Sequence, residues 1–219
     1  MSQFAGAYGG VDMWHEEWLA WRDGCRCVAG IDEAGRGALA GPVVAACVVL
    51  PLGWDAPGVR DSKTRTPLQR ESAFERIVGA ARGIGIGMAD AGVIDEVNVL
   101  RATHISMRRA LHALPGGLRP DLILIDGLPV RPFPTLQLAL VGGDGKSASI
   151  AAASIIAKVT RDRLMIAFDR EFPEYGFAGH KGYGAPEHLR ALTVQGPCRI
   201  HRVTFRPVAA AAERCASGR

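Results

Sequence analysis

Four acidic residues of this chain stand where predicted strands end, a pattern suited to holding metal ions. Asp32 and Glu33 follow one short apolar run. Asp126 follows a second run, and Asp144 follows a third. Ligands gather at the strand ends of open α/β sheets, and buried ionised carboxylates are costly unless a cation compensates them. Because hard divalent cations prefer carboxylate, water and phosphate oxygens, the pattern predicts metal-assisted phosphoryl transfer.

The segment directly after the first acidic pair, Gly35-Arg36-Gly37, is suited to contact with a phosphate backbone. Glycine lets the main chain approach a ligand closely, and the guanidinium of arginine matches the geometry of phosphate. Carboxylates, metal and phosphate together indicate a nucleic acid as the substrate. The net charge of +4 is only a mild preference for polyanions.

Two other glycine-containing strings resemble nucleotide-binding motifs without their context. Residues 35–40 have the spacing of a dinucleotide fingerprint, but a strand is predicted after them where that motif needs a helix. Residues 145–147 (Gly-Lys-Ser) imitate the end of a P-loop, whose first glycine would stand where the chain has Leu140. The Gly-Lys-Ser string still leaves a nucleoside triphosphatase as an alternative hypothesis. A measurement of ATP hydrolysis with Lys146→Ala would test it.

Hydrophobic periodicity predicts the elements that position these residues. Threonine followed by proline at 66–67 is a helix start, since threonine caps and proline suits the first turn. Asp162, in a basic run within the last long helix, is expected to form an ion pair rather than to bind metal. The expected strands are residues 27–31, 42–50, 83–88, 121–125 and 136–141, and the expected helices are 67–81, 91–97, 98–114 and 147–172.

Composition and length bound the class of protein. The chain has 219 residues, 48% of them hydrophobic, as in an ordinary globular domain. Its five cysteines fit no zinc spacing, and with no export signal they predict reduced thiols and a cytoplasmic location. No apolar stretch is long enough to span a membrane.

Residues 1–26 are expected to form an extension to a domain that spans residues 27–219. Trp14, Trp18 and Trp21 recur at helical spacing, which predicts a short amphipathic helix. That helix could pack on its own domain or bind a partner, and the sequence favours packing.

Longer motifs resemble bacterial ribonuclease HII. The strings GIDEAGRGALAGPVV, LILIDG, SIAAASIIAKVTRD, HKGYGAPEH and HRVTFRPV occur in that family's order, over about residues 28–208. The resemblance implies a ribonuclease H-like α/β fold, with a five-stranded mixed sheet flanked by helices and a C-terminal helical extension at about 173–219. It also implies an endonuclease that uses Mg²⁺ or Mn²⁺.

The resemblance further implies roles for individual residues. Asp32, Glu33, Asp126 and Asp144 match the family's four catalytic, metal-binding carboxylates. The substrate-binding matches are Gly35, Arg36 and Gly37 at the RNA-to-DNA junction, Asp61, Ser62 and Lys63 in a phosphate-contacting loop, Lys181, and Tyr183, which matches the junction-sensing tyrosine. The family often continues Asp-Ser-Lys with lysine, where this chain has Thr64. That departure leaves the phosphate contact of the loop open.

The resulting hypothesis is two-metal hydrolysis of RNA in RNA–DNA hybrids and incision 5′ of single ribonucleotides in duplex DNA. The expected products carry 3′-hydroxyl and 5′-phosphate ends, and the expected roles are ribonucleotide removal and DNA replication or repair. We expect a monomer that acts on these nucleic acids, with any replication or repair partner unknown. A noncatalytic nucleic-acid binder is the competing class, although clustered acids would repel phosphate without a metal.

Overall fold

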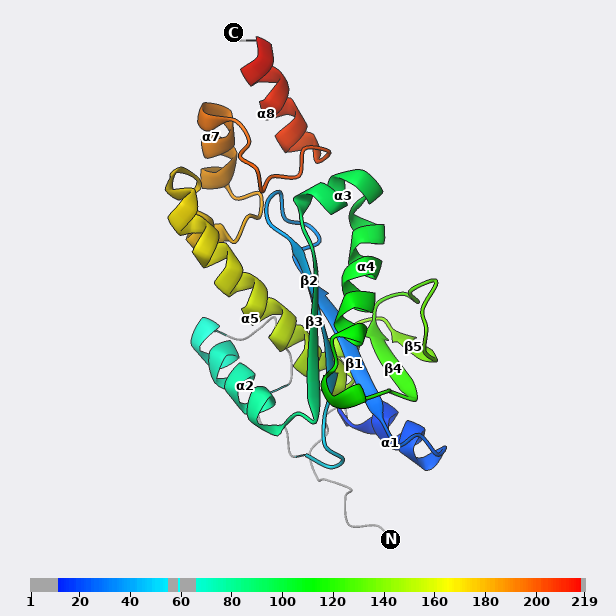
Figure 1. Cartoon of the computed structure of the whole chain (residues 1–219). Coiled ribbons are helices and arrows are strands. Elements are labelled where there is room, and N and C mark those ends of the chain that lie inside the picture. The colour runs from blue at the N-terminus through cyan, green and yellow to red at the C-terminus, as the bar shows by residue number, and fades with distance from the viewer. Residues whose placement is uncertain (1–11, 55–58, 60–65, 218–219) are drawn as a thin grey trace.

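The protein is an α/β structure built on a mixed sheet (Figure 1). The computed structural model describes residues 12–54, 59 and 66–217, and within them five strands form one sheet in the order β3-β2-β1-β4-β5. The central strand β1 pairs antiparallel with β2 and parallel with β4. The strands are β1 (Val28–Ala34), β2 (Val43–Val49), β3 (Gly83–Ala89), β4 (Leu122–Asp126) and β5 (Gln137–Leu140). The expected mixed sheet of five strands is confirmed.

Helices cover both faces of this sheet, with α4 on one face and α5 and α2 on the other (Figure 1). Short 3₁₀ turns lie at Pro115–Gly117, Gly143–Gly145 and Pro173–Tyr175. The helices of the described residues are α1 (His15–Arg22), α2 (Pro67–Ala80), α3 (Ala91–Val97), α4 (Val99–His112), α5 (Ala148–Glu171), α6 (Phe177–His180), α7 (Pro186–Gln195) and α8 (Arg206–Ser217).

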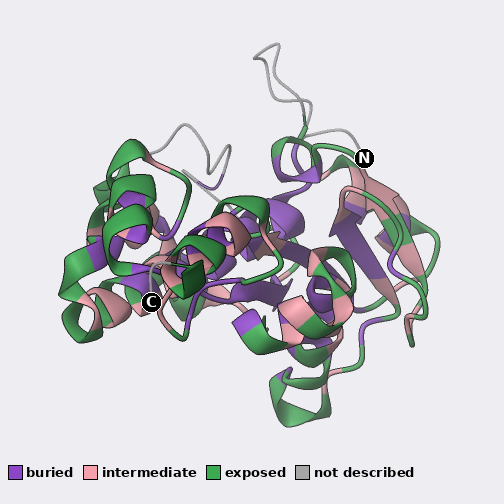
Figure 2. Ribbon diagram, turned by 90° about the horizontal axis from the view of Figure 1, so that it is seen from above, coloured by how far each residue is buried: buried purple, intermediate pink, exposed green. Residues whose placement is uncertain are grey.

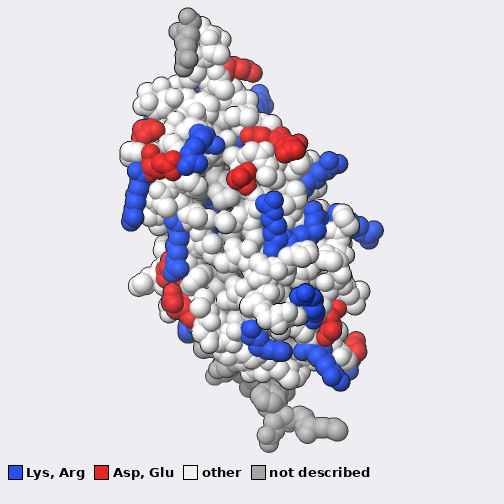
Figure 3. Space-filling view, in the orientation of Figure 1, with Lys and Arg blue, Asp and Glu red and all other residues white. Residues whose placement is uncertain are grey.

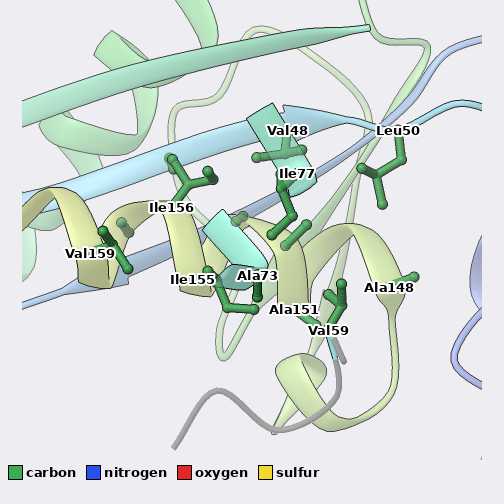
Figure 4. Packing of buried hydrophobic residues seen from close by; sticks show 14 of the residues in the cluster. Val48, Leu50, Val59, Ala73, Ile77, Ala148, Ala151, Ile155, Ile156 and Val159 are labelled. Carbon is green, nitrogen blue, oxygen red and sulfur yellow. The ribbon is translucent and has the colours of Figure 1, made fainter. Parts of the chain in front are cut away.

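Every residue of β2 is buried, because each face of this strand packs against a helical layer. Ala46 and Val48 belong to the core under α2 and α5, which Figure 4 shows around Ile77 and Ile155. Their neighbours Ala45, Cys47 and Val49 belong to the core under α4. Successive side chains of a strand point to opposite faces, so a continuous apolar run fills both layers. The buried residues accordingly concentrate along the sheet and the inner sides of the helices (Figure 2).

The glycines of β3 explain its alternating sequence. A Cβ atom added to Gly85 or Gly87 would lie 2.0 or 2.1 Å from a carbonyl oxygen of α4. These glycines therefore allow α4 to lie directly on the strand, and any larger side chain would force the two apart.

Local signals set the helix starts. Thr66 and Gln69 form the reciprocal capping box that begins α2, with Oγ1 of Thr66 accepting from the Gln69 amide at 3.3 Å. Asn98 caps α4 by accepting from two amides of its first turn, at 3.0 and 3.1 Å. Both helices begin within one residue of the predicted positions.

The end of β1 differs from the prediction. The strand was expected to stop at Ile31, but it continues to Ala34, so Asp32 and Glu33 lie inside the strand rather than after it. The reason is pairing with β2, which extends the ladder through Glu33 opposite Ala45 and Ala34 opposite Val44. Tertiary pairing overrides the low strand propensity of acidic residues.

The helix α1 packs on the rest of the molecule. Trp14 contacts the core under α5, and Trp21 packs with Ala20 against β1 and β4 residues. Trp18 is the exposed member of the three tryptophans, at 43%. The expected helix and its packing are thus observed, whereas the division of the chain at residues 26 and 27 stays a prediction.

The segment after α5 is helical, as expected of a C-terminal extension. Tyr175 and Phe177 stack on each other and pack against Met165 of α5, while Val208 of α8 packs on Leu39. All five cysteines are free thiols in this structure. Among the described residues, no helix combines the length and the apolar character needed to cross a membrane.

Candidate active site

Three of the four predicted carboxylates face one cavity at the end of β1. Asp32, Glu33 and Asp126 line this cavity of about 440 Å³. Parallel pairing sets Ile31 of β1 opposite Ile125 of β4, so the next residues along the two strands, Asp32 and Asp126, are neighbours. The strand register therefore brings together acids that stand more than ninety positions apart in the sequence.

The pKa values of the adjacent acids Asp32 and Glu33 are both raised, mainly by burial. Burial raises the pKa of Asp32 well above its ordinary value, and the charges of Glu33 and Asp126 raise it further, against hydrogen bonds from Ser154 and the Glu33 amide. Burial likewise raises the pKa of Glu33, although its ion pair with Arg36 at 3.2 Å opposes this. Such carboxylates need a proton or a cation to offset their charge.

Asp126 connects the cavity to the turn that holds Asp144. Its Oδ1 accepts from the Gly143 amide at 2.7 Å, which fixes the Gly143–Gly145 turn beside the end of β4. Asp144 is buried in that turn at 6% exposure, outside the residues that line the cavity. In the described part of the chain, no three His, Cys, Asp or Glu side chains form a ready-made metal site. Nevertheless, the all-oxygen donors and the raised pKa values of Asp32 and Glu33 fit a hard divalent cation.

Gly35, Arg36 and Gly37 line the same cavity as the acids. Gly35 has a φ of +96°, and a Cβ atom there would lie 2.0 Å from Nε of Arg161. Glycine is therefore required at this position for both conformation and space. Gly37 has open space around its Cα, which leaves its backbone accessible.

Tyr183 completes the cavity from the loop after α6. Its side chain is 37% exposed, and its ring lies 5.3 Å from the Arg161 guanidinium and 5.7 Å from Nζ of Lys158. Lys181 does not line the cavity with the acids, because its ammonium group donates to the carbonyl of Ala178. The predicted residues Asp61, Ser62 and Lys63 lie outside the described residues.

Sequence reasoning missed three polar residues of the lining, Arg70, Ser154 and Lys158. Ser154 and Lys158 are four apart on α5, so the helical period could have placed them on one face. Lys158 also forms an ion pair with Asp162 at 2.8 Å, which confirms the ion-pair role expected of that acid.

The structure argues against the P-loop alternative. The first turn of α5 is occupied by the carboxylate of Glu17, whose Oε1 accepts from Oγ of Ser147 at 2.7 Å and from the Ser149 amide at 2.9 Å. Nζ of Lys146 donates to the Val141 carbonyl at 2.7 Å. The groups that would cradle phosphates in a P-loop are therefore engaged within the protein. The dinucleotide alternative fails as well, since β2 and not a helix follows residues 35–40.

Comparison with solved structures identifies the class of the fold. Ribonuclease H2 from Pyrococcus horikoshii OT3 superposes with a TM-score of 0.71 at 30% identity, covering 86% of this chain and 98% of that chain. Bst-RNase HIII in complex with Mn²⁺ superposes with a TM-score of 0.72 at 19% identity, covering 88% of this chain and 71% of that chain. The fold is that of the ribonucleases H, and the protein is a hydrolase of this class.

Sequence comparison then identifies the family. The family model described as Ribonuclease HII matches residues 29–208. Ribonuclease HII of Geobacter sulfurreducens is 55% identical over 196 residues, covering 90% of this chain and 89% of that protein. The chain belongs to the ribonuclease HII family.

Proposed function

We propose that the protein is an endonuclease that hydrolyses the RNA strand of RNA–DNA hybrids and incises duplex DNA 5′ of single embedded ribonucleotides. The observation that supports this proposal is one shared cavity. Its lining includes the acids Asp32, Glu33 and Asp126 together with the Gly35–Gly37 turn and Tyr183. Groups suited to cleave a phosphodiester and groups suited to recognise a ribose therefore face the same bound nucleotide.

Asp32, Glu33 and Asp126 would hold Mg²⁺ or Mn²⁺, and Asp144 would join them from the adjacent turn. Divalent ions bound there would lower the pKa of the attacking water and neutralise charge on the phosphate. The expected products carry 3′-hydroxyl and 5′-phosphate ends. The protein's own part is orientation. A hydrogen bond from Ser154 fixes the carboxylate of Asp32, and a hydrogen bond from the Gly143 amide fixes that of Asp126.

Recognition of the ribonucleotide would come from other residues that line the same cavity. The backbone of Gly35 and Gly37 can approach the 2′-hydroxyl, the group that distinguishes RNA from DNA at a single nucleotide. The ring of Tyr183 can stack on a sugar or base, and its hydroxyl can hydrogen-bond nearby.

Basic side chains extend this surface. Arg70 and Lys158 line the cavity beside the acids and can contact phosphates of the cleaved strand. Figure 3 shows further basic side chains over α4. Burial lowers the pKa of His104 on α4, and the positive charges of Arg108 and Arg36 lower it further. Since Arg36 lines the cavity, positive charge continues from the cavity along this helix. A duplex is longer than the cavity, so this basic surface can contact phosphates beyond the cleaved nucleotide.

We infer that this activity serves ribonucleotide removal during DNA replication and repair, in the cytoplasm and as a monomer. The basis is the chemistry of the site, since incision beside one ribonucleotide is the first step of its excision from DNA. The free cysteines agree with a reducing compartment.

The test is cleavage of a duplex with one embedded ribonucleotide, with Mg²⁺, with Mn²⁺ and with a chelator. We expect metal-dependent incision 5′ of the ribonucleotide and no cutting of the all-DNA duplex. Asp126→Asn should abolish cleavage while hybrid binding persists, because it removes one carboxylate charge and keeps the shape of the side chain. Glu96→Gln, the same change at an exposed site on α3, should cleave like the wild type. Undiminished turnover by Asp126→Asn would overturn the assignment of this carboxylate.

A further inference from the structure

Two arginines are completely buried behind the Gly35–Gly37 turn. Arg161 of α5 and Arg202, which precedes α8, both have 0% exposure. Within the described residues their hydrogen-bond acceptors are all backbone carbonyls, and no carboxylate bonds to either guanidinium. Burying a charge in this way is costly, so the arrangement calls for an explanation beyond core packing.

Arg202 sets the orientation of two peptide groups in the turn. Its Nη2 donates to the Gly35 carbonyl at 2.7 Å and its Nη1 donates to the Arg36 carbonyl at 2.8 Å. In a trans peptide the C=O and N–H groups point in opposite directions. The amides of Arg36 and Gly37 are therefore turned away from Arg202, and both residues line the cavity. Two adjacent amides turned outward form a concave donor site for an anion or a hydroxyl.

Arg161 joins the segment after this turn to the loop that carries Tyr183. Its Nη2 donates to the Ala40 carbonyl at 3.0 Å, and its Nη1 donates to the Lys181 carbonyl at 2.9 Å. The same guanidinium lies 5.3 Å from the centre of the Tyr183 ring, within cation–π distance. One side chain therefore holds the segment after the turn and the tyrosine loop in a fixed relation.

The charge of Arg161 also acts on Arg202. Burial and the charge of Arg161 lower the pKa of Arg202 to about 9, which leaves it charged at neutral pH. Two positive charges buried behind the Gly35–Gly37 turn attract phosphate toward it and strengthen each hydrogen bond to a carbonyl.

We propose that Arg161 and Arg202 are positioning residues for ribonucleotide recognition, which fix the outward amides of Arg36 and Gly37 at a set distance from Tyr183. This inference rests on the proposed function, which places the backbone of the Gly35–Gly37 turn and Tyr183 at the embedded ribonucleotide. Neither arginine touches the substrate.

The test compares Arg161→Lys and Arg202→Lys, which keep the charge but lose the forked geometry that reaches several carbonyls. Matched controls are Arg163→Lys on α5 and Arg199→Lys, since both arginines are exposed and paired with glutamates. For each protein, KM and kcat are measured on the single-ribonucleotide duplex and on a continuous RNA–DNA hybrid.

We expect KM for the single-ribonucleotide duplex to rise about tenfold in both buried-site variants, the equivalent of one lost charged hydrogen bond. Their kcat and their KM for the continuous hybrid, where neighbouring ribonucleotides add contacts, should change less. The controls should match the wild type. An unchanged KM ratio between the two substrates in folded Arg161→Lys and Arg202→Lys would overturn the proposal. Failure of the wild type to incise the single-ribonucleotide duplex would instead overturn the proposed function.

Gly35→Ala supplies a second test in case the lysine variants do not fold. It removes no charge, but its methyl group would lie 2.0 Å from Nε of Arg161 and displace that side chain. The same selective rise in KM is expected. A wild-type ratio of the two KM values in folded Gly35→Ala would count against the proposal.

Discussion

His201→Gln is expected to remove much of the protein's sensitivity to mild acid. In the wild type, the Cys198 amide donates to Nδ1 of His201 at 3.0 Å, so the proton of this neutral ring is on Nε2. That Nε2 lies 2.9 Å from Nε2 of His188, whose own Nδ1 lies 2.8 Å from the Tyr183 carbonyl. Each N–H donor in this series of hydrogen bonds has one acceptor. A proton added to either imidazole ring would place two N–H groups directly opposite each other.

The structure gives the direction and size of the effect. Burial, together with the neighbouring His188, lowers the pKa of His201 to about 4, against 6.5 for the ordinary group. The unfolded chain therefore takes up the proton first. The stability that the neutral His201 ring contributes is fully present above pH 6.5. It is lost as the pH falls toward 4, and the total loss is about 3 kcal/mol.

The assay is urea unfolding of the wild type and His201→Gln at pH 7.0 and pH 4.5. The variant should be less stable at pH 7.0 by about 1–3 kcal/mol, because the Cys198 amide loses its acceptor. Between the two pH values, however, the wild type should lose about 2 kcal/mol more than the variant. Carboxylate titrations are common to both proteins and cancel in this difference.

His15→Gln, at an exposed position on α1, provides the control and should follow the wild-type dependence on pH. Parallel loss of stability in His201→Gln and the wild type would refute the reasoning, since it would show that His201 does not resist protonation in the folded state.

Two further predictions concern stability. Glu17→Ala leaves buried donors at the start of α5 without an acceptor, so the free energy of unfolding should fall by about 2 kcal/mol, against less than about 0.5 kcal/mol for Glu16→Ala on the same helix. Increased stability of Glu17→Ala would show that burying the carboxylate costs more than its hydrogen bonds contribute. Gly87→Ala should destabilise the protein by at least about 2 kcal/mol, because its Cβ would lie 2.1 Å from a carbonyl oxygen of α4, whereas Gly79→Ala, with open space on α2, should gain up to about 1 kcal/mol. Equal effects of the two glycine substitutions in thermal unfolding would contradict this account of how α4 packs.

Local sequence patterns were sufficient for most of the elements. The apolar run of β2, the alternating glycines of β3 and the Thr66 cap of α2 depend on neighbours within a few positions. Such signals act through propensity and periodicity, so they can be interpreted without knowledge of the fold. The acids at 32, 33 and 126 were recognisable for the same reason, since each follows an apolar run.

Other features depended on distant parts of the chain. The end of β1 moved to Ala34 because β2 supplies partners there, and Asp32 meets Asp126 only through the register of β1 and β4. Glu17 caps a helix that begins some 130 residues later. No local pattern specifies these pairings, because each depends on the path of the chain between the partners.

The sequence by itself supplied the chemical hypothesis for this protein: carboxylates that can bind cations, glycines and an arginine suited to a phosphate backbone, and a tyrosine to which the family resemblance gives a role at the ribose. Only the tertiary structure decided how these groups are held. Arg161 and Arg202 donate to backbone carbonyls, which every residue possesses, so no residue type in the sequence marks their partners. Their roles follow from burial and orientation, and these exist only once the chain has folded.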